Sequence, residues 1–112
     1  MADISFDYFL NVDIRVGEVL RAEPYPEAHN PAIKLWISFG PEIGEKKSSA
    51  QITKYYNPEM LVGKQVMAVV NFPPRQIGKF MSEVLVLGLS DPEGGIILIG
   101  PDAWVDNGEK MY

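Results

Sequence analysis

The chain has 112 residues, of which 46% are hydrophobic and 22% are charged, with a formal net charge of −5, one His and no Cys. This length favours a single domain, residues 1–112, with a core of limited size. The lack of cysteine excludes a disulfide scaffold, a thiolate metal cluster and a cysteine nucleophile, and the acidic sum argues against nucleic acid as a partner.

The N-terminal segment is acidic where a secretion signal would be basic, and no apolar run approaches the roughly 18 residues of a membrane-spanning helix. We therefore expect a cytoplasmic protein without membrane insertion. The 10 Gly and 9 Pro fall between short apolar runs. That distribution is typical of an all-β domain with many turns.

A short helix is expected over residues 4–11, with Asp3 or Ser5 as its cap. Phe6, Tyr8 and Phe9 crowd this segment, and one face of so short a helix cannot bury all three rings. They predict a dimer interface, with packing on the domain's own core as the alternative.

The strands follow. The first is expected from Ile14 to Val19, with a bulge or a sharp bend at Gly17. Pro24 and the two prolines after it should end this strand in a stiff loop. Between residues 33 and 39, apolar side chains alternate with more polar ones, as in a half-buried strand.

The remaining elements are expected to be a strand over 46–52, a helical turn starting at Asn57-Pro58-Glu59, and strands over 66–72, 84–89 and 96–99, with residues 73–83 as a connection. A helix between the third and fourth strands is the order of an OB-type barrel. The sequence thus predicts an all-β fold: a five-stranded OB-fold barrel with a short N-terminal helix.

The chain lacks the parts of an enzyme. Its only histidine, His29, lies in a proline-rich loop without an orienting partner, and no metalloprotease, phosphate-loop or dinucleotide motif is present. Asp91 and Glu93 lie in a turn, where we expect them to be solvated. We predict no catalysis, no cofactor and no metal.

The net charge conceals three blocks. Residues 1–45 carry a net −5, residues 46–82 a net +5 and residues 83–112 a net −5. A basic middle segment therefore lies between acidic flanks, and it can attract an anionic partner if its charges share one face of the fold.

The basic segment combines cations, hydroxyl groups, an amide and aromatic rings. Cations neutralise phosphates, and hydroxyl and amide groups bond phosphate, ribose or bases, while phenylalanine rings can stack on unpaired bases. The candidate RNA-binding residues here are Lys46, Lys47, Ser48, Ser49, Asn71, Arg75 and Lys79, with Phe72 and Phe80 as candidate stacking rings.

A second interpretation uses the same region for peptide binding. Phe72, Pro73 and Pro74, followed by Phe80 and Met81, form a rim of large apolar groups. Such a rim could hold an extended hydrophobic polypeptide. A rigid connection between two core strands is the alternative.

Several motifs resemble the EMAP II-like tRNA-binding domain. The resemblance covers residues 4–110. It is carried by Val12-Asp13-Ile14-Arg15-Val16-Gly17, Lys34-Leu35, Ser48-Ser49-Ala50-Gln51-Ile52, Asn71-Phe72-Pro73-Pro74-Arg75 and Ser82-Glu83-Val84-Leu85.

The resemblance implies an OB-fold homodimer, joined by the N-terminal helix and a C-terminal extension. It also implies tRNA binding through Lys34, Ser48, Ser49, Asn71, Arg75 and Ser82.

Ser82 is followed by Glu83-Val84-Leu85, where the family usually has one residue and then Gly-Met. This departure looks like that of a small stand-alone bacterial branch, described as an export-related chaperone for unfolded or preprotein chains. The implied function is binding of tRNA or structured RNA together with such a chaperone role. The alternative is a stand-alone tRNA-binding accessory protein with no chaperone role.

Overall fold

The computed structural model describes residues 1–112. In chain order the elements are α1 (Phe6–Leu10), β1 (Ile14–Tyr25), β2 (Ala32–Ser38), α2 (Gly40–Ile43), β3 (Glu45–Ala50), α3 (Pro58–Leu61), β4 (Gln65–Val69), β5 (Arg75–Ile77), β6 (Phe80–Ser82), β7 (Leu85–Val86), β8 (Gly88–Ser90) and β9 (Ile96–Leu98). None of the helices is long and apolar enough to cross a membrane.

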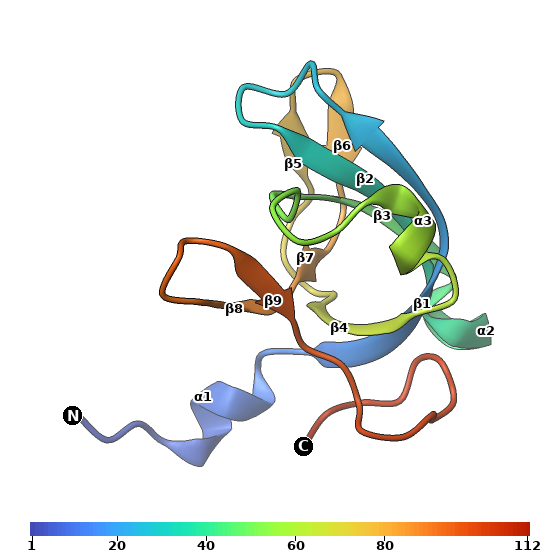
Figure 1. The fold of residues 1–112 in the computed structure, drawn as a ribbon. Coiled ribbons are helices and arrows are strands. Elements are labelled where there is room, and N and C mark those ends of the chain that lie inside the picture. Colours follow the sequence, from blue (N-terminus) through green and yellow to red (C-terminus); the bar gives the residue numbers. More distant parts are fainter.

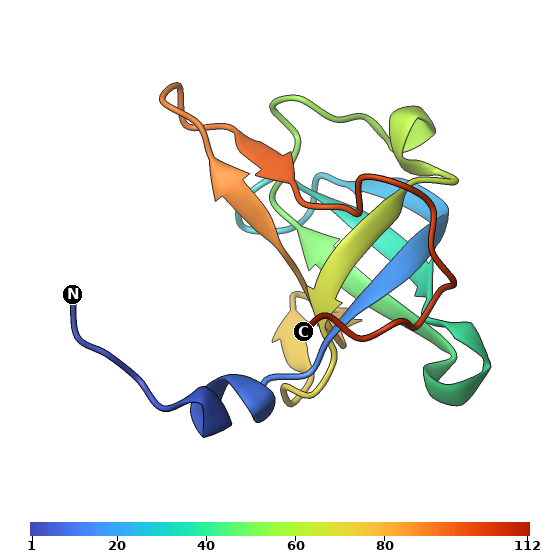
Figure 2. The ribbon, with the colours of Figure 1, turned by 90° about the horizontal axis from the view of Figure 1, so that it is seen from below.

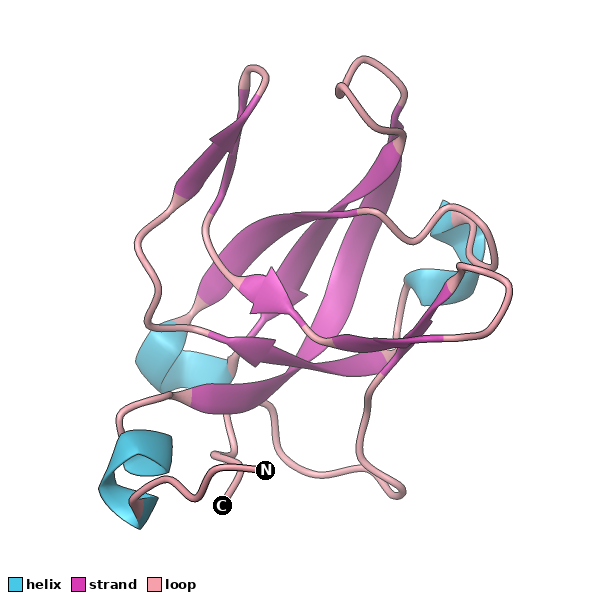
Figure 3. Ribbon diagram, turned by 90° about the vertical axis from the view of Figure 1, so that its left-hand side faces the viewer, coloured by secondary structure: helices cyan, strands magenta, loops and turns pink.

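Five strands form one antiparallel sheet in the order β3-β2-β1-β4-β7, which curls into a half-barrel (Figures 1 and 3). Two separate hairpins, β5–β6 and β8–β9, extend from it. The predicted all-β, OB-type fold is confirmed. The helical turn between β3 and β4 is also as predicted, with the Asn57 side chain accepting a hydrogen bond from the Met60 amide.

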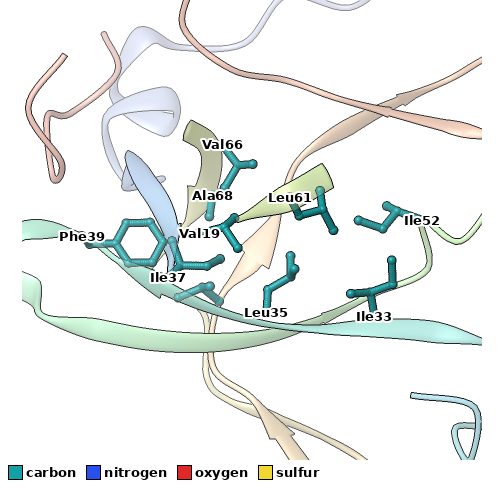
Figure 4. Packing of buried hydrophobic residues seen from close by; sticks show 10 residues of the cluster. Val19, Ile33, Leu35, Ile37, Phe39, Ile52, Leu61, Val66 and Ala68 are labelled. Carbon is teal, nitrogen blue, oxygen red and sulfur yellow. The ribbon is translucent and has the colours of Figure 1, made fainter. Parts of the chain in front are cut away.

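The core lies inside the curl of the sheet, as Figure 4 shows. Ile33, Leu35, Ile37 and Phe39 are all buried, so the alternation predicted for this strand is confirmed. The rest of the cluster comes from β1, β4 and α3 and from Ile52 and Val84, which lie between named elements. Because side chains alternate across a strand, the same pattern turns the intervening residues of β2 to the outer face.

The first strand is longer than predicted. β1 continues through Pro24 to Tyr25, and Pro24 pairs with Ile33 of β2. Its pairing with β4 ends at Glu18, so the last residues of β1 have one unpaired edge. Proline is tolerated at such an edge because its missing N–H removes no ladder bond.

Gly17 does not form the predicted bulge, because the irregularity of β1 lies between Val19 and Arg21. A Cβ atom at Gly17 would lie 2.5 Å from Ile37 Cγ2 and 2.7 Å from Phe39 Cε1. Gly17 is required here by close packing of β1 under these two core side chains.

Two elements in the C-terminal half of the chain differ from those predicted. The single strand expected over residues 84–89 is divided, because β7 pairs with β4 and β8 pairs with β9. The expected connection 73–83 contains the hairpin β5–β6. Its turn holds Gly78 at φ +61°, a conformation that glycine adopts without strain.

The packing at Gly17 gives a stability prediction. Gly17→Ala should lower the free energy of unfolding by about 1–3 kcal/mol, because the added methyl group overpacks the core. Urea denaturation measures this change. In a Phe39→Leu background, which makes room beside residue 17, the loss should be smaller.

Gly63→Ala is the matched control, since Gly63 has φ +88° and open space around the position of a Cβ. Its cost of about 1–2 kcal/mol comes from the backbone and should be unaffected by Phe39→Leu. An equal cost for Gly17→Ala in both backgrounds would contradict the packing argument.

Candidate functional site

The outer face of the sheet carries a cluster of cations and aromatic rings. In the β2–β3 register Lys34 is opposite Ser49 and Trp36 is opposite Lys47, and on the other side Arg21 of β1 is opposite Trp36. Residues directly opposite each other share one face of the sheet. We call the six residues of this cluster the cation–aromatic platform: Arg21, Tyr25, Lys34, Trp36, Lys47 and Phe80.

Each cation of the platform lies over a ring. The Arg21 guanidinium carbon is 4.0 Å from the Trp36 ring centroid. The ammonium groups of Lys34 and Lys47 lie 5.3 and 5.1 Å from the Phe80 centroid, and Lys34 lies 4.5 Å from the Tyr25 centroid. These contacts hold three positive charges together at partly exposed positions. Two acids lie beside them: Glu23, which forms an ion pair with Arg21, and Glu83, whose carboxylate accepts a hydrogen bond from the Lys47 amide.

The hairpin β5–β6 packs against β1 and β2 through the ring of Phe80. Phe80 is 8% exposed and packs against Tyr25 and Trp36, with centroid separations of 5.9 and 5.8 Å. The Tyr25 hydroxyl donates a 2.7 Å hydrogen bond to the Ile77 carbonyl. Phe80 was predicted to contact a peptide or a base, but its burial gives it a supporting role.

Between β3 and residues 82–84, side chains take the place of a regular ladder. The Ser48 hydroxyl donates to the Val84 carbonyl at 2.9 Å, and the Ser49 amide donates to Ser82 Oγ at 3.0 Å. Glu83 accepts from the Lys47 amide through Oε1 and donates its own amide to the Lys47 carbonyl. We call this hydrogen-bonded contact between β3 and residues 82–84 the closure. Ser48 is only 1% exposed, so this predicted RNA contact is instead part of the closure.

A groove of about 770 Å³ opens beside this closure. It brings together Ser49, Arg75 and Ser82 of the predicted RNA-binding set with Phe72 and Pro73 of the predicted peptide-binding set. Most of the remaining lining is apolar: Ala50, Ile52, Ile77, Val84, Leu85, Val86, Ile96 and Leu98. Phe72 is 50% exposed.

The other predicted residues lie outside the groove lining. Asn71 accepts from the Asp13 amide and donates to the Asn11 carbonyl, so both ends of its amide hold the segment before β1. Lys79 lies in the exposed turn between β5 and β6, Met81 is exposed on β6, and Pro74 is exposed just before β5. Lys46 is opposite Ile37, so it lies on the other face of β3 from Lys47.

The Asp13-Ile14-Arg15 motif has a structural role. Arg15 Nε donates to Asp13 at 2.7 Å, and Nη1 donates to the Gly108 carbonyl at 3.0 Å. The Arg15 guanidinium therefore holds the pKa of Asp13 below its ordinary value. This pair ties the C-terminal segment to β1.

Helix α1 extends away from the barrel (Figure 2). Ser5 is its cap and accepts a hydrogen bond from the Asp7 amide. The helix has no buried residue, and Phe6 is 69% exposed. Phe6 and Phe9 pack on each other at 6.1 Å, with Tyr8 exposed beside them. The predicted interface residues thus form an exposed aromatic surface.

The β8–β9 hairpin, which borders the groove, is fastened by Asp91. Its carboxylate accepts hydrogen bonds from the Tyr55 hydroxyl and from the amides of Glu93 and Gly95. The Tyr55 bond lowers the pKa of Asp91 and raises that of Tyr55. Asp91 was expected to be solvated, and it has this structural role instead. No three His, Asp or Glu side chains are grouped to hold a metal ion, and His29 is exposed in its loop.

Sequence reasoning missed Arg21, Tyr25 and Trp36 as members of the site. Two of the three platform cations, Arg21 and Lys34, come from the acidic first block of the sequence. The alternation of β2 could have indicated that Lys34 and Trp36 share the outer face. Arg21 and Tyr25 of β1 join the platform because the β1–β2 register shifts after Val19. The residue pattern of β1 alone does not reveal this shift.

Comparison with known proteins relates this chain to tRNA-binding domains. The family described as "Putative tRNA binding domain" matches residues 14–110. Methionine--tRNA ligase of Porphyromonas gingivalis (strain ATCC 33277) is 39% identical over 109 residues, which are 97% of this chain and 16% of that protein. The chain thus spans about a sixth of the length of this curated relative.

Two solved structures match over nearly the whole chain. Chaperone CsaA from Bacillus anthracis str. Ames has a TM-score of 0.93 at 51% identity, covering 99% of this chain and 100% of that one. CsaA chaperone protein from Picrophilus torridus has a TM-score of 0.91 at 46% identity, with 98% and 100% covered.

The chain belongs to the tRNA-binding domain family. Within that family its sequence and fold are CsaA-like.

The Tyr55–Asp91 contact predicts a pH dependence. A carboxyl group whose pKa is lowered by folding stabilises the fold above its unfolded pKa, and this stabilisation is lost as the pH falls through the folded value. Tyr55→Phe should move the pKa of Asp91 back towards its ordinary value and speed amide exchange in β8–β9. An NMR titration of the Asp91 carboxyl group measures the first effect. Tyr112→Phe, at an exposed terminal tyrosine, is the control, and an unmoved Asp91 titration in Tyr55→Phe would contradict the assignment.

Proposed function

We propose that this chain is a non-catalytic, CsaA-like protein that binds tRNA or structured RNA and holds unfolded or preprotein chains, with a chaperone-like role in protein export. The observation that carries this proposal is the placement of two different surfaces next to each other. The platform is cationic and aromatic, whereas the groove is mainly apolar. A polyanion and an extended polypeptide require different surfaces of these kinds.

The platform supports RNA binding. Its cations lie on β1, β2 and β3, and OB-folds bind oligonucleotides on the face formed by their second and third strands. Lysines fixed over rings lose little freedom when they meet a phosphate. The proposed phosphate contacts are Arg21, Lys34 and Lys47, with Lys79 in the turn between β5 and β6 and Ser49 as a polar contact. Lys46 lies on the other row of β3, Arg75 and Ser82 line the groove, and Ser48 and Asn71 are structural supports.

The groove supports the holding of polypeptide. Phe72 and Pro73 line its rim, and Arg75 is the one cation among its lining residues. Met81 and Pro74 are exposed nearby in sequence and extend the apolar surface. The alternative function, a tRNA-binding accessory protein without chaperone activity, uses the platform alone.

We further propose that the protein is a cytoplasmic homodimer, joined through α1 and the C-terminal segment. A helix of five residues is unstable by itself in water, yet α1 buries none of its residues in this chain. Trp104 is also 61% exposed, in the C-terminal segment. A second copy that covers Phe6, Tyr8 and Phe9 would stabilise the helix and present two RNA-binding faces on one particle.

The RNA proposal is tested by Lys34→Gln combined with Lys47→Gln. The double variant should weaken tRNA binding about tenfold and reduce the slope of log K against log salt by about 1.4–1.8, because two phosphate contacts are lost. Binding titrations at several salt concentrations measure both effects. Lys64→Gln with Lys110→Gln removes the same charge outside the platform and should change the slope little. Equal effects of the two double variants would contradict a specific RNA site.

The chaperone proposal is tested by Phe72→Ser, with Met60→Ser as a control that removes an exposed apolar side chain on α3. Phe72→Ser should at least halve the suppression of aggregation of chemically unfolded citrate synthase, followed by light scattering, because the groove loses its exposed ring. Its tRNA affinity should stay unchanged. Suppression that is equal in wild type and Phe72→Ser would contradict the groove, and no suppression by the wild type would favour the accessory function.

A further inference from the structure

The guanidinium group of Arg21 has one covered face and one open face. Its central carbon lies 4.0 Å from the centroid of the Trp36 ring, so the ring covers one side of the group. Arg21 is opposite Trp36 in the β1–β2 register, which places both side chains on the outer face of the sheet. The Arg21 side chain is 60% exposed. The face of the guanidinium that is turned away from Trp36 is therefore open to a ligand.

Glu23 occupies one edge of the same guanidinium group. Its Oε2 atom accepts a hydrogen bond from Arg21 Nε at 2.8 Å and forms an ion pair with Arg21 Nη2. The N–H bonds of a guanidinium lie in its plane, so the carboxylate binds the group at its edge and leaves its faces uncovered. Trp36 on one face and Glu23 on one edge together hold the position of the plane. The second face and Nη1 remain for a ligand.

The position of Glu23 favours a nucleobase over a phosphate at this side of the platform. A phosphate that binds the Nε edge of Arg21 must displace the Glu23 carboxylate, which carries the same sign of charge. A base that lies on the open face leaves the ion pair intact. Unpaired bases of RNA stack on the planes of arginine guanidinium groups as well as on aromatic rings.

The two lysines of the platform are placed to hold the phosphates of the same strand. Lys47 is opposite Trp36, and Lys34 is opposite Glu23, so both lie on the strands next to this position. The two ion pairs of the structure, Arg15–Asp13 and Arg21–Glu23, involve neither lysine. Neighbouring strands are about 4.8 Å apart. A base over Arg21 on β1 therefore has cations for its phosphates on β2 and β3.

We propose that the open face of Arg21 is a stacking site for one unpaired nucleobase of the bound RNA. The base lies on the guanidinium, the guanidinium lies on Trp36, and the phosphates beside this nucleotide contact Lys34 and Lys47. This inference rests on the proposed RNA binding and specifies an unpaired strand as the part of the RNA that the platform holds. Because every base has a π-face, the stack accepts bases of any identity.

Arg21→Lys tests the stack, because lysine keeps the positive charge but lacks the planar group. The probes are fluorescein-labelled octaadenylate and an octamer with the same phosphates but tetrahydrofuran units in place of the nucleosides, in anisotropy titrations. Arg21→Lys should weaken octaadenylate binding about threefold, the size of one exposed cation–π contact. It should leave the affinity for the base-free octamer unchanged, because the charge is kept. Equal losses for the two octamers, or no loss for octaadenylate, would overturn the stacking site.

A second measurement uses the unaltered protein, so it does not depend on the folding of Arg21→Lys. In NMR spectra the Arg21 Nε–Hε signal should move upfield when octaadenylate is added, because a stacked base adds its ring current. The base-free octamer should not cause this upfield shift. The Arg15 Nε–Hε signal, from the ion pair with Asp13, is the internal reference. An Arg21 signal that moves no more than that of Arg15 at saturating octaadenylate would overturn the inference.

The outcomes separate this inference from the proposed function. Equal affinity of the wild type for both octamers would overturn the stack, while RNA binding through the phosphates stands. If Lys34→Gln with Lys47→Gln weakens tRNA binding but octaadenylate leaves the Arg21 signal unmoved, the inference alone fails. If the wild type binds neither tRNA nor octaadenylate, both proposals fail.

Discussion

The contact between β3 and residues 82–84 is the constraint on which both surfaces of this molecule depend. Five hydrogen bonds join β3 to residues 82–84 there, all between residues more than thirty positions apart in sequence; they come from Lys47, Ser48 and Ser49 on one side and Ser82, Glu83 and Val84 on the other. They hold the end of β6 against β3, and thereby press Phe80 onto the outer face of the sheet. The same contact ends where the groove begins. Loss of this closure would therefore displace the ring beneath the platform lysines and remove one wall of the groove.

Strand β2 serves two functions because its side chains alternate. Its inward residues supply much of the main core, and its outward residues Lys34 and Trp36 supply the centre of the platform. A rigid strand fixes both rows at once, so the position of each cation is determined by the packing of the core behind it. Gly17 contributes to this arrangement, since its missing side chain lets β1 lie close to Ile37 and Phe39. The geometry of the platform is thus set by core packing.

The parts of this structure that could be predicted are those with a local signal. The alternation of Ile33 to Phe39 identified the central strand, and Asn57-Pro58 identified the start of α3, because each depends on a few consecutive residues. The burial of Ser48 and Phe80 depends on partners in distant elements, Val84 and Tyr25. A hydroxyl group beside two lysines looks like a ligand contact until its distant acceptor is known. The extension of β1 through Pro24 was missed because a strand accepts a proline only where one of its edges is unpaired. Which part of β1 has an unpaired edge depends on the pairing with β4, which the local sequence does not show.

The charge pattern shows how register reorganises a sequence. The basic block 46–82 does not fold into one basic face: Lys54 bonds the Glu93 carbonyl at the β8–β9 hairpin, Lys64 lies in the turn before β4, and Arg75 lines the groove. The cations that gather are Lys47 from this block and Arg21 and Lys34 from the acidic first block. Because their clustering follows the β1-β2-β3 register, a net charge of −5 is compatible with a local cationic surface. The same dispersal leaves the groove with one cation and one anion. A domain of this size can therefore present a surface suited to a polyanion next to one suited to an uncharged chain.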